Sequence, residues 1–363
     1  MEFLSEYGLF LAKTVTLVVA VIVVIGVMIA MNSKATHSGR GHIEVSSIND
    51  GLNAVTRTLK QVVLSESDWK AEAKAQKKQD KKDEKEQAKA SKNDEAVERK
   101  SRVFVVDFDG DVQASAVDQL REEITAILSV AETMDEVVLR LESPGGMVHS
   151  YGLAASQLSR VVGKDVKLTV AVDKVAASGG YMMACLATNL IAAPFALLGS
   201  IGVVAQIPNF NRFLKGKEID VEILTAGEYK RTLTMLGENT DKGREKFIEE
   251  LEDVHSMFKD FVKENRPVVD TDIVATGEAW YGKRALEHKL VDALQTSDEY
   301  LVECCGRADV YRVKFVEDKS RMDKLLDRFS IAASALLGGR LTPENWQEPK
   351  SQTILAKDSR HHF

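Results

Sequence analysis

In the middle of the chain, short apolar runs alternate with amphipathic stretches, and this alternation limits the possible folds more than any other feature. The apolar runs, typical of buried strands, cover residues 103–112, 137–143 and 166–178. The spacing of apolar residues predicts helices between them, over 117–133 and 147–162. Strands and helices that alternate in this way form βαβ units with right-handed crossovers. The sequence therefore predicts an α/β fold with a mainly parallel sheet.

The uncharged run over residues 181–207 has the hydropathy of a membrane span. Thr188, Pro194 and Gly199 divide this run into pieces that are too short to cross a bilayer. Strands buried on both faces are apolar throughout, so the pieces fit a buried α/β core. We expect core elements here and no second span.

Two further patterns follow the apolar run. Residues 221–230 have the composition of a strand that leads into a loop, and residues 244–267 have the spacing of a long amphipathic helix. A turn, a helix and a final strand are expected over residues 273–294.

The N-terminus carries a long apolar segment without a charge, over residues 14–31. Extended back to residue 9, it reaches the roughly 20 residues that a spanning helix needs. Glu2 and Glu6 precede it, whereas a cleaved signal peptide begins with basic residues. The sequence predicts a single-pass anchor through residues 9–31, and the flanking lysines and arginine favour a cytoplasmic C-terminal side only slightly.

Composition then divides the chain into four segments. A membrane anchor over 1–34 is followed by a charged helical or disordered spacer over 35–101, whose Lys, Glu and Ala residues form no apolar stripe. A folded domain is expected over 102–310 and a C-terminal extension over 311–363. The net charge of −7 argues against a nucleic-acid partner. The three cysteines have no metal-ligand spacing, and we expect neither a metal nor a cofactor.

Three glycine-marked turns each follow an apolar strand, at residues 143–146, 178–180 and 199–202. Glycine permits tight turns and lets another molecule approach bare N–H groups. A helix that starts after such a turn directs N–H groups at a developing anion, as an oxyanion hole requires. The alternative is an ordinary helix start with a serine cap and an early proline.

Ser178 is a candidate nucleophile at the junction of a buried strand and a buried helix. Such a serine needs a base. His149 lies close behind the first glycine turn, although an ordinary polar contact also explains it. Lys230 is the other candidate, because burial disfavours the charged form of lysine and makes it a base near neutral pH. The residue pattern alone leaves both bases open, and a surface lysine is the simpler explanation of Lys230.

Five motifs in one order resemble the signal peptide peptidase A family of Ser-Lys serine proteases. They are ESPGG, VAASGGYMMA, APFALLGSIGV, TAGEYKR and TGEAWYGKRALEHKLVDAL, and the resemblance covers about residues 103–300. It implies a Clp protease/crotonase-like fold built from repeated ββα and βαβ units. It also implies a role for each matching residue: Ser178 as nucleophile, Lys230 as general base, Ser200 as the serine that orients the lysine amine, and Gly145, Gly146 and Gly179 as the oxyanion hole, with Gly145 favoured as donor.

The resemblance implies a membrane-anchored serine endopeptidase that forms an acyl-enzyme. Its expected substrates are signal peptides or other peptides and proteins near the membrane. Family members with one catalytic domain form rings, in some of which serine and lysine come from neighbouring subunits, so a homo-oligomer is expected. The family places the catalytic domain on the periplasmic face of the bacterial inner membrane. Two alternatives are a crotonase-fold acyl-CoA enzyme, which would use acidic residues, and an inactive membrane scaffold.

Overall fold

The structure, a computed structural model, describes residues 6–11, 13–17, 41–90 and 99–317. Within these ranges no helix is both long and apolar enough to cross a membrane. The anchor predicted over residues 9–31 lies mostly outside the described residues, and so does the C-terminal extension beyond its first strand.

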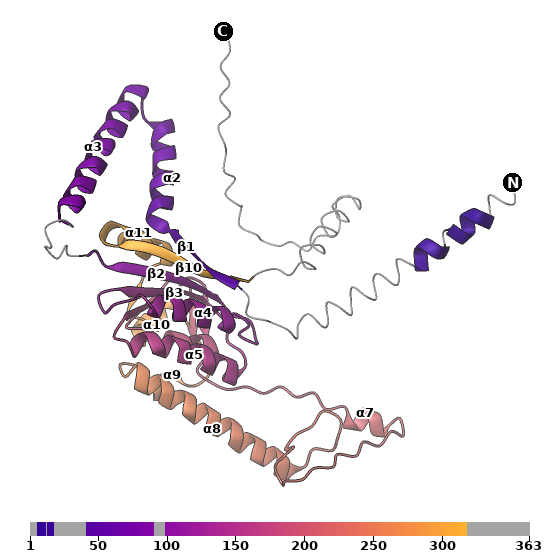
Figure 1. Cartoon of the computed structure of the whole chain (residues 1–363). Helices are drawn as coiled ribbons and strands as arrows, with labels where there is room; N and C mark the ends of the chain where they lie inside the picture. Colours follow the sequence, from indigo (N-terminus) through magenta and orange to yellow (C-terminus); the bar gives the residue numbers. More distant parts are fainter. Residues whose placement is uncertain (1–5, 12, 18–40, 91–98, 318–363) are drawn as a thin grey trace. The chain divides into compact units, whose positions relative to one another are not determined.

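A seven-stranded sheet is the largest element of the unit that comprises residues 42–316 (Figure 1). In spatial order its strands are β1 (Gly41–Ser47), β10 (Asp309–Glu317), β2 (Arg102–Asp109), β3 (Glu136–Glu142), β4 (Lys167–Val172), β6 (Asn189–Ala192) and β9 (Ala293–Leu294). All pairings from β10 to β9 are parallel. The predicted α/β fold with a mainly parallel sheet is confirmed.

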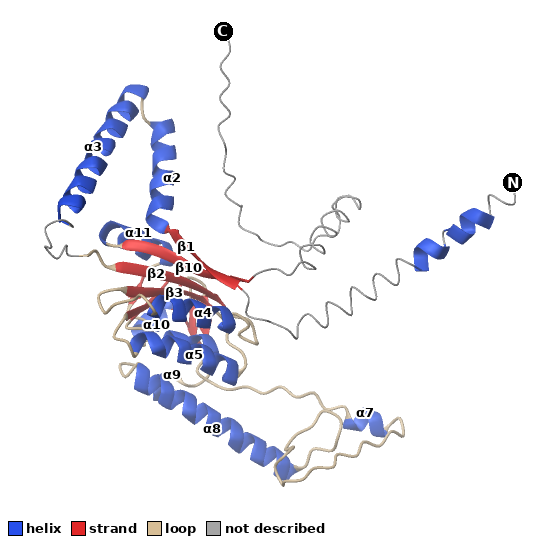
Figure 2. Ribbon diagram, in the orientation of Figure 1, coloured by secondary structure: helices blue, strands red, loops and turns tan. Residues whose placement is uncertain are grey.

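Both faces of this sheet are covered by helices (Figure 2). Along β2, Phe104 and Val106 join one hydrophobic cluster, while Val103 and Val105 join the other, as the alternation of side chains along a strand requires. The first cluster includes apolar residues of α4 (Val117–Leu128), α5 (Val148–Val162), α6 (Gly179–Ala184) and α8 (Asp241–Asn265), and the second includes residues of α11 (Ser297–Arg307).

A second sheet of three strands carries the glycine turns. It consists of β5 (Val175–Ala177), β7 (Leu197–Gly199) and β8 (Ala279–Tyr281); β5 pairs with β7 in parallel and β7 with β8 antiparallel. The single strand predicted over 166–178 is therefore wrong, because the chain changes sheets between β4 and β5. Apolar patterning cannot reveal such a change, because both strands are buried.

The uncharged run is part of the α/β core from Tyr181 to Ile201, whereas residues 204–207 are exposed. It contributes most of α6 and all of β6 and β7. Its aromatic residue Tyr181 is fully buried and donates its hydroxyl proton to the backbone oxygen of Leu290. The prediction of core elements in place of a second span is confirmed.

The segment between β7 and α8 differs from the prediction. Its only described helix is the short α7 (Asn211–Lys215), and residues 221–230 form a loop, so the strand predicted there is wrong. A strand needs a partner, and Ile223 packs against Gly237 of the same segment instead. The helix predicted over 244–267 is confirmed as α8, which begins at Asp241.

Further helices are α2 (Ile48–Val63), α3 (Glu66–Ala90), α9 (Thr271–Val274) and α10 (Gly282–Glu287), and residues 6–11 and 13–17 are also helical. The side chain of Asn49 ties the start of α2 to the main sheet, because it donates to the backbone oxygens of Cys305 and Ala308 and accepts from the N–H of Val310. β1, α2 and α3 thus occupy most of the segment predicted as a spacer.

Candidate active site

The three glycine turns meet because the strands that precede them are neighbours. Ser143 forms a parallel bridge with Ala176, and Ala177 is in register with Gly199. The N–H of Ser178 donates to the oxygen of Gly199 at 2.8 Å. Since the carboxyl ends of parallel strands lie at the same edge, Ser178 and Ser200 leave their strands side by side.

Ser178 precedes α6 without acting as a helix cap. Its backbone has φ 52° and ψ −119°, and its side chain makes no capping hydrogen bond. Such a conformation costs a non-glycine residue roughly 1–3 kcal/mol and concentrates at functional sites. The side chain is half-buried, and its hydroxyl has no hydrogen-bond partner among the described residues. The ordinary explanation of Ser178, a cap that stabilises the helix, therefore does not apply.

Gly145 lies against the Ser178 turn at a distance that only glycine allows. A Cβ atom on Gly145 would lie 2.7 Å from the Cβ of Ser178 and 2.8 Å from the nitrogen of Gly179, and its φ is +89°. On the next residue, a Cβ on Gly146 would lie 2.1 Å from the oxygen of Val112. The first turn is thus packed tightly between the candidate nucleophile and the loop that follows β2.

The backbone N–H groups around the first glycine turn differ in whether they already have a hydrogen-bond acceptor. The N–H of Gly145 donates to the hydroxyl of Ser143 at 3.1 Å. The N–H groups of Gly146 and Gly179 have no acceptor within the part of the chain that the structure describes. Gly145, favoured by the sequence as donor, has its N–H occupied in this structure, and Gly146 and Gly179 have theirs available.

Ser200 also adopts a left-handed backbone, with φ 50°. Its N–H donates to the oxygen of Glu278 at 2.7 Å, and its hydroxyl donates weakly to the oxygen of Gly277 at 3.4 Å. Gly199 before it has φ +94°, and a Cβ there would lie 3.0 Å from the ring of Trp280. The strain at Ser178 is thus repeated at Ser200 on the neighbouring strand.

Lys230 is not brought to these serines within one chain. It lies exposed in the loop before α8, where its neighbour Glu228 pairs with Lys242 at 2.5 Å. The Tyr229 ring lies 5.5 Å from the amine of Lys246. Lys230 itself contacts neither Ser178 nor Ser200 in any hydrogen bond between described residues.

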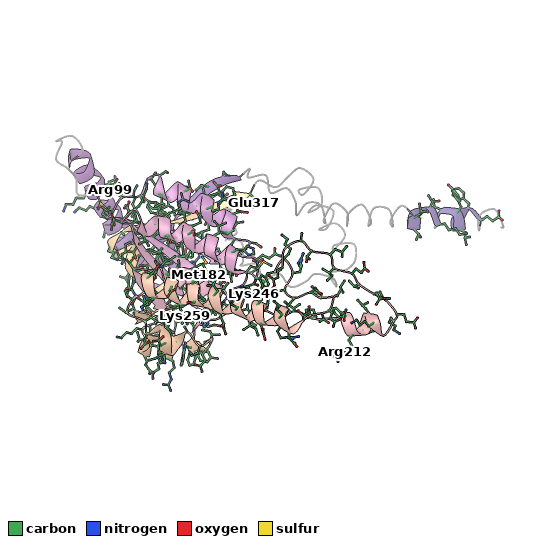
Figure 3. All side chains as sticks on the ribbon, turned by 90° about the horizontal axis from the view of Figure 1, so that it is seen from below. Arg99, Met182, Arg212, Lys246, Lys259 and Glu317 are labelled. Carbon is green, nitrogen blue, oxygen red and sulfur yellow. The ribbon has the colours of Figure 1, made fainter. Side chains whose placement is uncertain are left out.

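The length of α8 shows how far the loop that carries Lys230 lies from the Ser200 turn. His255, farther along α8, contacts the backbone oxygen of Ile201 at 3.3 Å, next to the Ser200 turn. At 1.5 Å per residue, Lys242 and Lys246 lie about 14–20 Å along the helix from His255. Figure 3 labels Lys246 and Lys259 on α8 and Arg212 on α7. The structure therefore groups Ser178, Ser200 and the glycines, and it places Lys230 elsewhere.

His149, the alternative base, lies exposed on the first turn of α5. It makes no hydrogen bond to any described residue. In the described ranges no three His, Cys, Asp or Glu side chains are placed to hold a metal ion.

Sequence reasoning missed two residues that contact the site, the hydroxyl of Ser143 and the side chain of Tyr151. The sequence pattern explains Ser143 as a helix cap and Tyr151 as part of a helical stretch. Both are fully buried, and their oxygens lie 2.6 Å apart. The available signal was an aromatic residue with a hydroxyl one helical turn after the first glycine turn.

Two protein-family models together match most of this chain. The models "Peptidase family S49 N-terminal" and "Peptidase family S49" match residues 2–158 and 161–310. A Haemophilus influenzae protein named "Probable protease SohB" is 50% identical over 325 residues, which are 89% of this chain and 92% of that protein. Another "Probable protease SohB", from Buchnera aphidicola subsp. Acyrthosiphon pisum, is 54% identical over 235 residues, covering 65% of this chain and 69% of that protein.

Among solved structures, a mutant of the 1510-N membrane-bound stomatin-specific protease, in complex with a substrate peptide, aligns with a TM-score of 0.38. The two sequences are 14% identical, and the alignment covers 64% of this chain and 99% of the other.

Proposed function

The chain belongs to peptidase family S49 and is a serine protease, and on this basis we propose that Ser178 and Lys230 are its catalytic dyad. The conformation of Ser178 is the observation that carries the proposal. A strained serine that does not cap its helix, beside two backbone amides without an acceptor among the described residues, has the features of a nucleophile next to an oxyanion hole.

In the proposed mechanism, the neutral amine of Lys230 takes the proton of Ser178 as its oxygen attacks the peptide carbonyl. The N–H groups of Gly146 and Gly179 receive the developing oxyanion, while Gly145 shapes the turn. The lysine then gives its proton to the leaving amine, and an acyl-enzyme remains. The same lysine then takes a proton from water as the water oxygen attacks the ester, and it gives this proton to the Ser178 oxygen as the ester bond breaks. Ser200 orients the lysine amine from the neighbouring strand.

We further propose that the lysine is supplied by a neighbouring copy of the chain. The support is the separation along α8, which keeps Lys230 away from Ser178 and Ser200 of its own chain. The segment that carries Lys230 also exposes large apolar side chains, with Val204 90% and Leu224 91% exposed. A second copy that covers this surface would remove apolar area from water and complete the site.

The sheet arrangement supports the finer assignment to a Clp protease/crotonase-like fold, because a parallel sheet and a smaller sheet together place the serine at strand ends. The apolar segment over residues 9–31 supports a single-pass membrane tether. Substrates would then be signal peptides or other membrane-proximal peptides, with the catalytic domain on the periplasmic face. These assignments stand with the dyad as proposals.

The dyad is tested by labelling and hydrolysis. The full-length chain is treated with a fluorescent fluorophosphonate and assayed on fluorescein-labelled casein, next to Ser178→Ala, Lys230→Ala and the control Lys217→Ala from the same exposed segment. Ser178→Ala should lose both the label and the activity, Lys230→Ala should lose at least about 100-fold in rate, and the control should keep both.

Full activity of Lys230→Ala would show that Lys230 is not the base and would favour His149 in that role. Activity and labelling that persist in Ser178→Ala would end the assignment of the nucleophile. A wild-type chain that takes no label and cleaves nothing would favour an acyl-CoA enzyme or a scaffold.

A further inference from the structure

Tyr151 is a fully buried tyrosine one turn into α5, and its hydroxyl lies at the centre of a hydrogen-bonded chain. It donates to the backbone oxygen of Asp111 at 2.8 Å, and its oxygen lies 2.6 Å from the hydroxyl oxygen of Ser143. A tyrosine has one proton to donate. Because that proton is directed at Asp111, the Ser143 hydroxyl donates to Tyr151.

This assignment determines what Ser143 can accept. Because the Ser143 hydroxyl donates its hydrogen bond to Tyr151, the lone pairs of its oxygen accept the N–H of Gly145, 3.1 Å away. The N–H of Gly145 therefore points into the turn, and its peptide plane is held there. The next amide, that of Gly146, is left without an internal acceptor. Burial raises the pKa of Tyr151, so its hydroxyl stays protonated at neutral pH. The hydrogen bonds from Ser143 to Tyr151 and from Tyr151 to Asp111 therefore keep their direction.

The ring of Tyr151 acts on the opposite side of the site. A Cβ atom on Gly179 would lie 2.4 Å from Cγ of the ring and 2.7 Å from Cδ2. The ring is therefore in close contact with the backbone of the residue that follows the nucleophile. Gly110, in the loop after β2, closes the other side, because a Cβ there would lie 2.5 Å from the hydroxyl oxygens of both Ser143 and Tyr151.

We propose that Tyr151 is a positioning residue that sets the geometry of the oxyanion hole from both sides, through the Ser143 hydroxyl at the first glycine turn and through its ring at Gly179. The inference rests on the proposed function, because it requires Gly146 and Gly179 to receive the oxyanion. Donors must lie about 2.7–3.1 Å from the oxyanion, so a small rotation of either amide weakens the transition state more than the bound substrate.

The test compares Tyr151→Phe, Ser143→Ala and their double variant in the full-length chain. Tyr300→Phe is the matched control, because Tyr300 is a buried tyrosine on α11 that donates its hydroxyl proton to Glu136. Two readouts are taken: kcat and KM on a fluorogenic peptide of small apolar residues, and inhibition by the corresponding peptide aldehyde. The aldehyde forms a hemiacetal with the nucleophile, so its oxygen probes the oxyanion hole.

We expect Tyr151→Phe to lower kcat about 10–100-fold, somewhat less than the loss of an oxyanion donor, and to change KM less than about 2-fold. Aldehyde affinity should fall by the same factor as kcat/KM. Ser143→Ala should act in the same direction, and the double variant should lose no more than the worse single variant, because both residues act through one chain. Tyr300→Phe should keep kcat and aldehyde affinity.

Wild-type kcat in Tyr151→Phe, or additive losses in the double variant, would overturn the inference. So would a loss in Tyr151→Phe that Tyr300→Phe reproduces, since it would reflect stability alone. Failure of the proposed function gives a different result: Ser178→Ala would then stay active, and the aldehyde would not inhibit the wild-type chain.

Discussion

Glu123 offers a stability prediction with a magnitude that follows from its surroundings. This residue of α4 is only 4% exposed, and its carboxyl accepts the N–H of Phe315 in β10 at 2.8 Å. Burial raises its pKa from 4.5 to about 7, and the nearby carboxylate of Asp107 adds to the effect. The folded chain thus holds a proton at Glu123 that the unfolded chain releases above about pH 4.5.

The sign of the pH dependence follows. Between about pH 4.5 and 7 the folded state binds more protons than the unfolded state, so the free energy of unfolding falls as the pH rises. A pKa raised from 4.5 to about 7 corresponds to a loss of roughly 3 kcal/mol in the free energy of unfolding, reached in full above pH 7. Glu123→Gln keeps an oxygen for Phe315 and carries no charge. It should therefore gain roughly 3 kcal/mol at pH 8.5 and almost nothing at pH 4.

The measurement is thermal unfolding of the two proteins at pH 4, 6 and 8.5. For a unit that spans residues 42–316, the gain at pH 8.5 corresponds to a rise in Tm of roughly 5 °C. The control is Glu122→Gln, which removes the charge of the exposed neighbour on the same helix and should leave Tm nearly unchanged. An equal shift of Glu123→Gln at all three pH values, or none at pH 8.5, would refute the reasoning.

Two further substitutions test the packing around the site and the ion pairs at the amino ends of β2 and β3. Gly145→Ala should lower kcat at least about 100-fold in a folded protein, because its Cβ would lie 2.7 Å from the Cβ of Ser178 at a φ of +89°. Steady-state kinetics measures kcat, and circular dichroism checks that the variant is folded. A kcat near that of the wild type would contradict the close approach of Gly145 to Ser178. Burial alone would raise the pKa of Asp135, but the hydrogen bonds from Arg102, from the backbone and from Arg99 lower it below its ordinary value. Asp135→Asn should therefore cost about 3 kcal/mol at pH 7, and this loss should shrink as the pH falls below about 4, because the unfolded carboxyl becomes protonated while the folded carboxyl is still charged. Urea unfolding at pH 7 and pH 3 measures this, and an equal loss at both values would show that charge is not the cause.

The sequence was most informative where structure depends on local patterns. The alternation of strands and helices predicted the parallel sheet, and the three glycine turns marked the strand ends that meet at Ser178 and Ser200. Apolar periodicity predicted α5 and α8 nearly to their observed ends. It could not show that the chain changes sheets after β4, because both strands are equally apolar.

The parts of the site that depend on distant contacts were not predictable. The motif containing Lys230 suggested a strand end near the serine, yet its loop pairs with the start of α8 through Glu228 and Lys242. The role of Gly145 depends on a hydrogen bond to Ser143 that no spacing reveals. The sequence pattern does not distinguish Tyr151 from any other aromatic residue of a helix, because its contact with Gly179 joins residues from two different helices.

The most direct test of the account is complementation between two inactive variants. Ser178→Ala and Lys230→Ala are co-expressed in equal amounts, purified as mixed assemblies and assayed on labelled casein. If the nucleophile and the base come from neighbouring copies, random mixing pairs an intact serine with an intact lysine at about one quarter of the sites, and activity should approach one quarter of wild type. Mixed assemblies that form normally but show no more activity than either variant alone would contradict a dyad shared between copies.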